Sequence, residues 1–264
     1  MDYSTLLFEI RNNVARITLN RPQAANSINL DMSRELMHAA IRCSEDPSVR
    51  AVILTGSGSM FCAGGDLKAF AAQGDNLPGH LKEVTTNLHA AVSRLVRMDA
   101  PVVAAVNGTA AGGGMSLCLP CDLVLAAESA KFTLAYTRAG LSPDGSSSYF
   151  LPRLIGLRRA LELALTNRVL TASEAVAWGI ATKAVPDRDL QTEAQTLAAQ
   201  LAAGATRALG AAKRLLHFGA SESLETQMEL EAQAIAEQVR IGEGREGMAA
   251  FLGKRAPRFT GARR

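Results

Sequence analysis

Two glycine-rich turns could supply backbone amides as hydrogen-bond donors to a ligand. Gly64-Gly65-Asp66 and Gly112-Gly113-Gly114 each follow an apolar stretch, 51–55 and 102–106, that predicts a buried strand. Glycine lets a backbone N–H approach a ligand with no side chain in the way. Two such amides that converge from two turns would stabilise one developing oxyanion. For either turn taken alone, tight packing is the simpler interpretation.

An acid and a histidine are the side chains that could act beside these amides. Ser142-Pro143-Asp144-Gly145 is typical of a turn, and the serines at 146–148 lead into a predicted helix, so Asp144 is expected just before that helix and aimed inward. His89 lies on a predicted helix over 80–98, next to Leu88 of its apolar face. By itself, such a histidine is more often packed or exposed than catalytic.

The elements that must position these groups alternate between strand and helix in the first part of the chain. A hairpin is predicted over 8–11 and 15–19, and a helix capped by Asn29 is predicted to run to about residue 44. The stretch 74–79 is expected to be flexible. From residue 146 onward the pattern predicts almost only helices, one of them capped by Ser173.

This order predicts an α/β core over 1–200 and a helical region over 201–264. The glycine pattern over 108–114 does not fit dinucleotide binding, because no acid stands clearly about 20 residues further on.

Composition and charge narrow the class of protein. The chain has 264 residues, 48% hydrophobic and 20% charged, which is ordinary for a globular protein, and its net charge of +3 does not favour nucleic acid or a membrane surface. The apolar region 100–127 is interrupted by Asn107, by glycines and by Asp122, so it predicts buried strands rather than a membrane span.

The four cysteines, 43, 62, 118 and 121, include one C-x-x-C pair without a second pair, so buried reduced thiols are expected and a metal site is not. With no signal peptide at the N-terminus, the sequence predicts a cytoplasmic protein.

Several motifs together resemble the crotonase superfamily of acyl-CoA enzymes, the enoyl-CoA hydratases and isomerases. They are Asn20-Arg21-Pro22 with Asn26-Ser27, Phe61 through Leu67, Pro101 through Gly114, and Glu246 through Arg255. The resemblance implies a spiral of ββα turns with a C-terminal helical trimerisation region, and a homotrimer or a dimer of trimers. It also implies an acyl-CoA thioester substrate, with coenzyme A as part of the substrate and no separate cofactor.

The same resemblance implies roles for particular residues. The amides of Gly65 and Gly113 would form the oxyanion hole for the thioester oxygen. The remaining implied positions would contact the substrate. Lys254 would reach its nucleotide end, from a neighbouring subunit if the protein is a trimer. The positions are Ala24 and Ala25 in the segment that begins at Gln23, Ala63, Asp66, Leu67, Lys68, Tyr136 and Lys254.

The sequence departs from the hydratase pattern at its two glutamates. Ser116 and Tyr136 stand at those positions, and neither is a carboxylate base at neutral pH. An acid appears instead at Asp144, where isomerase members carry one, and the surrounding stretch looks most like members that isomerise an epoxide of phenylacetyl-CoA. An acyl-CoA isomerase with Asp144 as proton shuttle is therefore the favoured hypothesis.

Three alternatives stay open. Asp144, His89 and the aromatic Tyr136 also match members that dehalogenate 4-chlorobenzoyl-CoA, where an aspartate nucleophile attacks the ring and a histidine activates water. Against this, Gly65 replaces a bulky aromatic residue. A hydratase and a non-catalytic acyl-CoA binder are the other two.

Overall fold

The computed structural model describes residues 3–259, and a six-stranded sheet forms its centre. The strand order is β1-β2-β3-β5-β7-β10, with the β1–β2 pair antiparallel and every other pair parallel. The bounds are β1 (Leu6–Arg11), β2 (Val14–Leu19), β3 (Ala51–Gly56), β5 (Val102–Val106), β7 (Leu123–Ala127) and β10 (Lys183–Val185).

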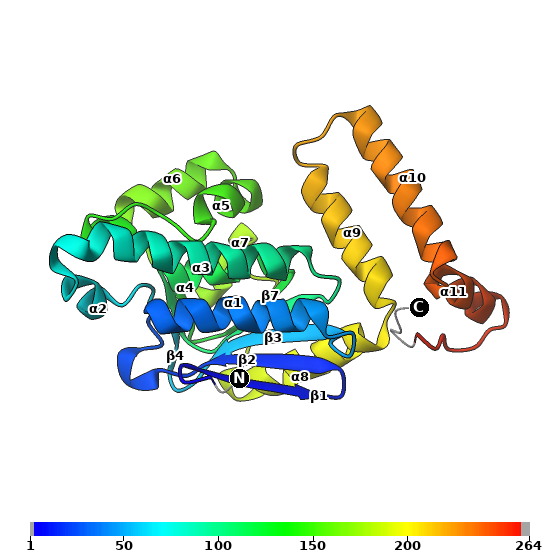
Figure 1. Cartoon of the computed structure of the whole chain (residues 1–264), viewed down its shortest axis with the longest axis horizontal. Coiled ribbons are helices and arrows are strands. Elements are labelled where there is room, and N and C mark those ends of the chain that lie inside the picture. Colours follow the sequence, from blue (N-terminus) through cyan, green and yellow to red (C-terminus); the bar gives the residue numbers. More distant parts are fainter. Residues whose placement is uncertain (1–2, 260–264) are drawn as a thin grey trace.

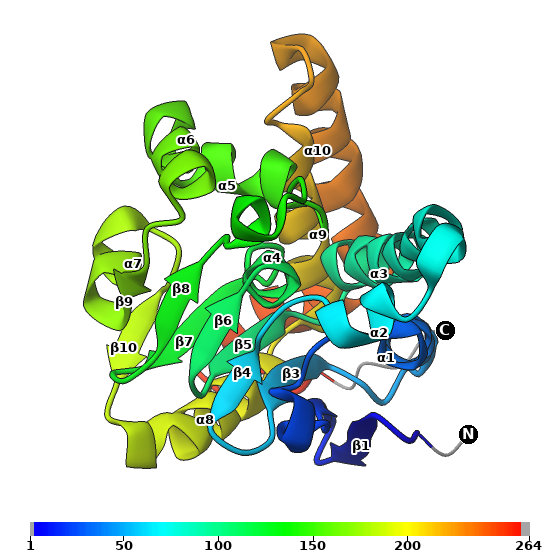
Figure 2. The ribbon, with the colours of Figure 1, turned by 90° about the vertical axis from the view of Figure 1, so that its left-hand side faces the viewer.

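A second sheet of short strands lies against the first (Figure 2). Its order is β4-β6-β8-β9, with β4, β6 and β8 parallel and β9 antiparallel to β8. The bounds are β4 (Met60–Cys62), β6 (Thr109–Ala111), β8 (Lys131–Thr133) and β9 (Leu170–Thr171). Three times the chain passes from a strand of the first sheet to a strand of the second and then into helix, which gives the ββα spiral.

Helices surround both sheets (Figure 1). In Figure 1, α1 and α3 lie together on one side of the main sheet and α8 lies on the other. The helices are α1 (Leu30–Glu45), α2 (Leu67–Ala71), α3 (Leu77–Arg97), α4 (Gly113–Cys118), α5 (Ser147–Ile155), α6 (Leu157–Thr166), α7 (Ala172–Trp178), α8 (Leu190–Ala203), α9 (Thr206–Phe218), α10 (Leu224–Arg240) and α11 (Glu243–Leu252).

Single-turn 3₁₀ helices occupy Pro22–Ala24 (η1), Gly74–Asn76 (η2), Tyr136–Ala139 (η3) and Asp187–Asp189 (η4). The predicted boundary at residue 200 falls within α8. Of the helices that follow it, α9 is held to the core by the Lys213–Asp122 ion pair, whereas α10 and α11 extend away from the sheets (Figure 1).

The strongly patterned elements are confirmed. The hairpin pairs β1 with β2, and the Asn29 side chain caps α1 by accepting a hydrogen bond from the Met32 amide at 3.0 Å. The apolar positions of the predicted helix 80–98, Val84, Leu88, Val92 and Leu95, are buried along α3. These predictions held because each rests on a periodicity that spans many residues.

Other predictions were wrong. The stretch 74–79 is not a flexible loop: η2 occupies its first part and α3 begins at Leu77, with Pro78 in the first turn, where proline favours a helix start. Strands β9 and β10 interrupt the part predicted to be almost entirely helical. The cap of α7 is Thr171 rather than Ser173, because Thr171 and Glu174 form a reciprocal capping box.

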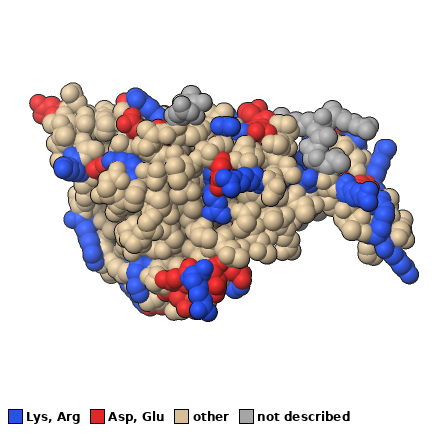
Figure 3. Space-filling view, turned by 90° about the horizontal axis from the view of Figure 1, so that it is seen from below, with Lys and Arg blue, Asp and Glu red and all other residues tan. Residues whose placement is uncertain are grey.

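The four cysteines are buried and unpaired with one another, and burial raises the pKa of the Cys43 and Cys62 thiols to about 12. Within residues 3–259, no helix is both long and apolar enough to cross a membrane, and no cluster of three potential metal ligands occurs. On the face shown in Figure 3, basic side chains are interspersed with acidic ones, and further basic side chains gather at the end that carries the C-terminal helices.

Candidate active site

Three neighbouring strand ends bring the predicted site together. Gly64-Gly65 follows β4, Gly112-Gly113 follows β6, and Tyr136 follows β8 by three residues. Because these strands are parallel neighbours, their carboxyl ends meet at one edge of the second sheet. Sequence analysis placed both glycine turns after the longer strands of the main sheet. The short strands β4 and β6, which position the turns directly, were missed.

The two glycine turns are in contact. A Cβ atom on Gly64 would lie 2.9 Å from the Ala111 carbonyl oxygen and 3.2 Å from the Gly113 nitrogen, and the φ of Gly64 is +97°. A side chain at residue 64 would therefore both strain the backbone and push the turns apart. Within residues 3–259, neither the Gly65 amide nor the Gly113 amide donates a hydrogen bond to the protein, so both are available to a ligand oxygen.

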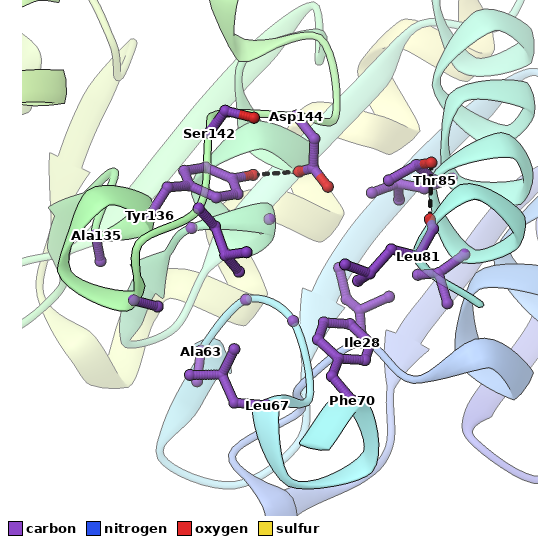
Figure 4. A pocket seen from close by; sticks show the side chains of 18 of the residues that line it. Ile28, Ala63, Leu67, Phe70, Leu81, Thr85, Ala135, Tyr136, Ser142 and Asp144 are labelled. Carbon is purple, nitrogen blue, oxygen red and sulfur yellow. Dashed lines mark hydrogen bonds between the residues drawn. The ribbon is translucent and has the colours of Figure 1, made fainter. Parts of the chain in front are cut away.

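A cavity of about 330 Å³ opens in front of these turns. Most of its wall is apolar, and Asp144 is the only carboxylate in the lining that the structure describes. In Figure 4, Asp144 and Tyr136 stand across the cavity from Leu67 and Phe70. The apolar side chains come from four parts of the chain: Ile28, Leu67 and Phe70, then Leu81, Val84 and Leu88 of α3, and Leu141.

Asp144 is joined to Tyr136 and Ser116 by hydrogen bonds. The Tyr136 hydroxyl donates a short hydrogen bond to Oδ1 of Asp144, and it lies 2.8 Å from Oγ of Ser116 (Figure 4). Burial, together with the adjacent Asp144 charge, raises the pKa of the Tyr136 hydroxyl well above its ordinary value. Tyr136 therefore keeps its proton at neutral pH and acts as a donor toward the carboxylate.

His89 lies on the other side of the Asp144 loop. Its Nε2 accepts a hydrogen bond of 3.3 Å from the Gly145 amide. The imidazole is exposed and lines a second hollow, where Asp144 also forms part of the wall, rather than the cavity before the glycine turns. The structure thus places His89 beside the backbone of the acid loop and away from the candidate amides.

The residues implied for substrate contact divide into two sets. Ala63, Leu67 and Tyr136 line the cavity. Ala24, Ala25, Asp66 and Lys68 lie outside the lining, and the Ala25 carbonyl accepts the Ala63 amide at 3.0 Å. Lys254 follows α11, and Figure 1 shows that helix at the opposite end of the molecule from α2.

The Asp66 carboxylate has a structural role next to the cavity. It caps α2 by accepting the Ala69 amide at 3.0 Å, and it forms an ion pair of 2.9 Å with Arg21. Burial acts to raise the pKa of Asp66, but the hydrogen bonds from Ala69 and Arg21 outweigh it and lower that pKa. Asp66 is therefore an ionised anchor that fixes the turn carrying Gly65.

Phe70 is a cavity residue that sequence analysis missed. A Cβ atom on Gly65 would lie 2.6 Å from Cε2 of Phe70, so the ring fills the space that a side chain at residue 65 would need. No local pattern marks Phe70, because its position depends on how α2 folds back over the turn. An aromatic ring thus lies directly beside Gly65, although residue 65 itself has no side chain.

A ββα spiral with paired glycine turns at one sheet edge defines a crotonase-fold protein of the acyl-CoA enzyme class. The chain belongs to the enoyl-CoA hydratase/isomerase family, whose sequence model matches residues 9–262. A solved enoyl-CoA hydratase from Bacillus anthracis superposes with a TM-score of 0.92 at 34% identity, covering 98% of this chain and 100% of that one.

Relatives in the family carry different activities in their names. The chain is 43% identical to a probable enoyl-CoA hydratase of Rhodobacter capsulatus, over 99% of this chain and 100% of that one. It is 38% identical to the 1,2-epoxyphenylacetyl-CoA isomerase of Escherichia coli, over 97% and 98%. It is 37% identical to 4-chlorobenzoyl coenzyme A dehalogenase-2 of an Arthrobacter species, over 91% and 88%. The family is therefore established, but the relatives' names do not distinguish between hydratase, isomerase and dehalogenase reactions.

Proposed function

We propose that this protein is an acyl-CoA isomerase in which Asp144 moves a proton and the amides of Gly65 and Gly113 hold the thioester oxygen. The single observation that carries this proposal is that Asp144 is the only carboxylate in the described lining of the cavity before the two amides. Isomerisation needs one group that removes and returns a proton. Hydration needs groups that position and deprotonate a water molecule.

The proposed reaction begins with the acyl carbonyl oxygen bound by the two amides. The Asp144 carboxylate removes a proton from the carbon next to the thioester carbonyl, and the electron pair of that C–H bond moves toward the carbonyl oxygen. The resulting enolate carries its charge where the two amides donate hydrogen bonds. Asp144 then returns the proton further along the chain, so the double bond has moved and no atom has been gained or lost.

The decisive variant is Asp144→Asn, which removes the base and keeps the side-chain size. With a 3-enoyl-CoA and with an epoxyphenylacetyl-CoA as substrates, we expect the variant to lose at least about 100-fold in kcat, the lower range for a general base. Calorimetry should give an unchanged Kd for free CoA, because Asp144 contacts only the acyl part. Full turnover by the variant would contradict the proposal.

The dehalogenase alternative is favoured by one observation, the hydrogen bond from the Gly145 amide to His89, which places the histidine beside Asp144. If Asp144 is a nucleophile, 4-chlorobenzoyl-CoA incubated with His89→Gln should leave an aryl adduct on the protein that mass spectrometry detects. Absence of both adduct and chloride release would exclude this function. Hydratase activity is measured in the same panel by water addition to a 2-enoyl-CoA.

A further inference from the structure

The acid of the proposed reaction is the end point of a hydrogen-bonded chain. The chain begins at Ser116, whose hydroxyl donates to the Tyr136 hydroxyl 2.8 Å away, and it ends at Oδ1 of Asp144, which accepts from Tyr136. The Ser116 amide donates to the Gly112 carbonyl at 3.0 Å. Gly112 directly precedes Gly113, whose amide is one of the two proposed oxyanion donors. The chain therefore links the turn that would hold the thioester oxygen to the carboxylate that would move the proton.

We propose that Tyr136, supported by Ser116, is a positioning residue that occupies one oxygen of the Asp144 carboxylate and directs the other oxygen at the substrate. This inference rests on the proposed function and deepens it. Ser116 and Tyr136 stand where the hydratase pattern has its two glutamates, and neither side chain can deprotonate water.

The described surroundings of Asp144 show why Tyr136 matters. Within residues 3–259, the Tyr136 hydroxyl is the only donor to the Asp144 carboxylate, and no lysine or arginine forms an ion pair with it. In Figure 4 the second carboxylate oxygen points away from Tyr136 into the cavity. The orientation of the Asp144 carboxylate thus depends on one neutral donor.

Other charged groups near the loop could also influence Asp144. Lys82 of α3 lines the cavity, and His89 of the same helix uses its Nε2 on the Gly145 amide. The hollow behind the loop adds five more titratable or charged groups from α3, α5, α9 and the turn after α9, which are Arg97, Tyr149, Arg214, His217 and Glu222. All of them are unchanged by a substitution at residue 136, so they cancel in a comparison of variants.

Close packing holds the hydrogen-bonded residues Ser116, Tyr136 and Asp144 at fixed distances from one another. Ser116 is fully buried in α4, and Gly145, with a φ of +58°, passes so close that a Cβ atom there would lie 2.8 Å from Cβ of Ser116. The Asp144 carbonyl also accepts the Ser147 hydroxyl at 2.8 Å. Because the loop is packed this closely, we expect the Asp144 carboxylate to gain no new donor when the Tyr136 hydroxyl is removed.

The kinetic test uses Tyr136→Phe, which keeps the ring and removes the hydroxyl. On a 3-enoyl-CoA, we expect kcat to fall by about tenfold to a hundredfold with KM within about twofold, as for loss of one hydrogen bond to a charged group. Because a hydrogen-bond donor favours the charged form of a carboxylate, loss of the Tyr136 hydroxyl should move the acid limb of kcat/KM to higher pH. Ser116→Ala should give a smaller shift in the same direction, and Tyr3→Phe, at the N-terminal edge, none.

A second measurement needs no substrate. The Asp144 carboxyl carbon is followed by ¹³C NMR in protein labelled at aspartate, with its signal assigned by its loss in Asp144→Asn. We expect the midpoint to rise in Tyr136→Phe and to fall when residue 136 is 3-fluorotyrosine, a stronger donor of the same shape. Equal midpoints in these proteins, or an unmoved acid limb, would overturn the inference. If the wild type isomerises no thioester, the proposed function fails, and the NMR midpoints still decide the role of Tyr136.

Discussion

At the scale of single residues, the candidate site depends on the absence of side chains at Gly64 and Gly65. A side chain at Gly65 would meet the Phe70 ring, and one at Gly64 would meet the neighbouring turn. Neither position has room for a Cβ atom, and glycine at both positions lets the turn approach its neighbours while the Gly65 amide faces the cavity. The Phe70 ring is buried, and it packs edge to face against the His80 ring, with the ring centres 5.9 Å apart.

Gly65→Ala should therefore impair catalysis more than folding. The added methyl must displace the Phe70 ring or the turn, which moves the amide from its place, and kcat on the isomerase substrate should fall by about 100-fold or more. Gly65→Ala combined with Phe70→Leu should recover part of the loss, because the smaller side chain relieves the contact.

Gly79→Ala serves as the matched control, since a Cβ atom there meets nothing within 4 Å. A Gly65→Ala enzyme with full activity would show that the amide at residue 65 has no part in the reaction.

At the scale of elements, short strands and their caps decide the geometry that long periodic patterns leave open. Strands β4 and β6 have three residues each, too few for alternation to be recognised, yet their parallel pairing with each other and with β8 sets the two glycine turns and Tyr136 at one edge. The start of α7 also depends on the tertiary structure. Ser173 was the predicted cap, but the cap is the side chain that reaches the unpaired amides of the first turn of α7. The structure selects Thr171, whose Oγ1 accepts the Glu174 amide at 3.2 Å.

The two candidate caps give a direct comparison. Thr171→Ala should lower the free energy of unfolding by about 1 kcal/mol, because it leaves a first-turn amide of α7 without its acceptor. Ser173→Ala, two residues along, should change it by less than about 0.5 kcal/mol. Urea unfolding followed by circular dichroism measures both. Equal losses in the two variants would mean that the capping box contributes nothing beyond local propensity.

At the scale of the whole molecule, the C-terminal helices present apolar side chains to the outside. α9 is tied to the core by the buried pair of Lys213 and Asp122 at 2.9 Å, whereas α10 and α11 extend away from the sheets (Figure 1). The exposed apolar residues on these three helices are Leu216, Phe218, Leu224, Met228, Ile235, Met248, Phe251 and Leu252. So much unburied apolar surface favours association with further copies of the chain.

The resemblance to the crotonase superfamily implies a trimer or a dimer of trimers, so light scattering after size exclusion should give three or six times the chain mass of 27.9 kDa. Phe251→Glu with Leu252→Glu should reduce that mass, because each places a charge where an apolar side chain is now 84% or 80% exposed and available for contact. Leu7→Glu, at an exposed leucine of the edge strand β1, is the control and should leave the mass unchanged. A wild-type protein with the mass of one chain would contradict the predicted trimer.

The sequence by itself determined the long helices, the main-sheet strands built on buried apolar runs, and the family, because periodicity and motif order are properties of the chain alone. It also singled out Asp144, since the two hydratase glutamates are absent at Ser116 and Tyr136. Only the tertiary structure decided that Phe70 covers Gly65, that Tyr136 donates to Asp144, and that His89 faces the other side of the loop. These contacts join segments that are distant in sequence or connected by irregular turns, and their geometry depends on how the ββα spiral closes rather than on any local preference.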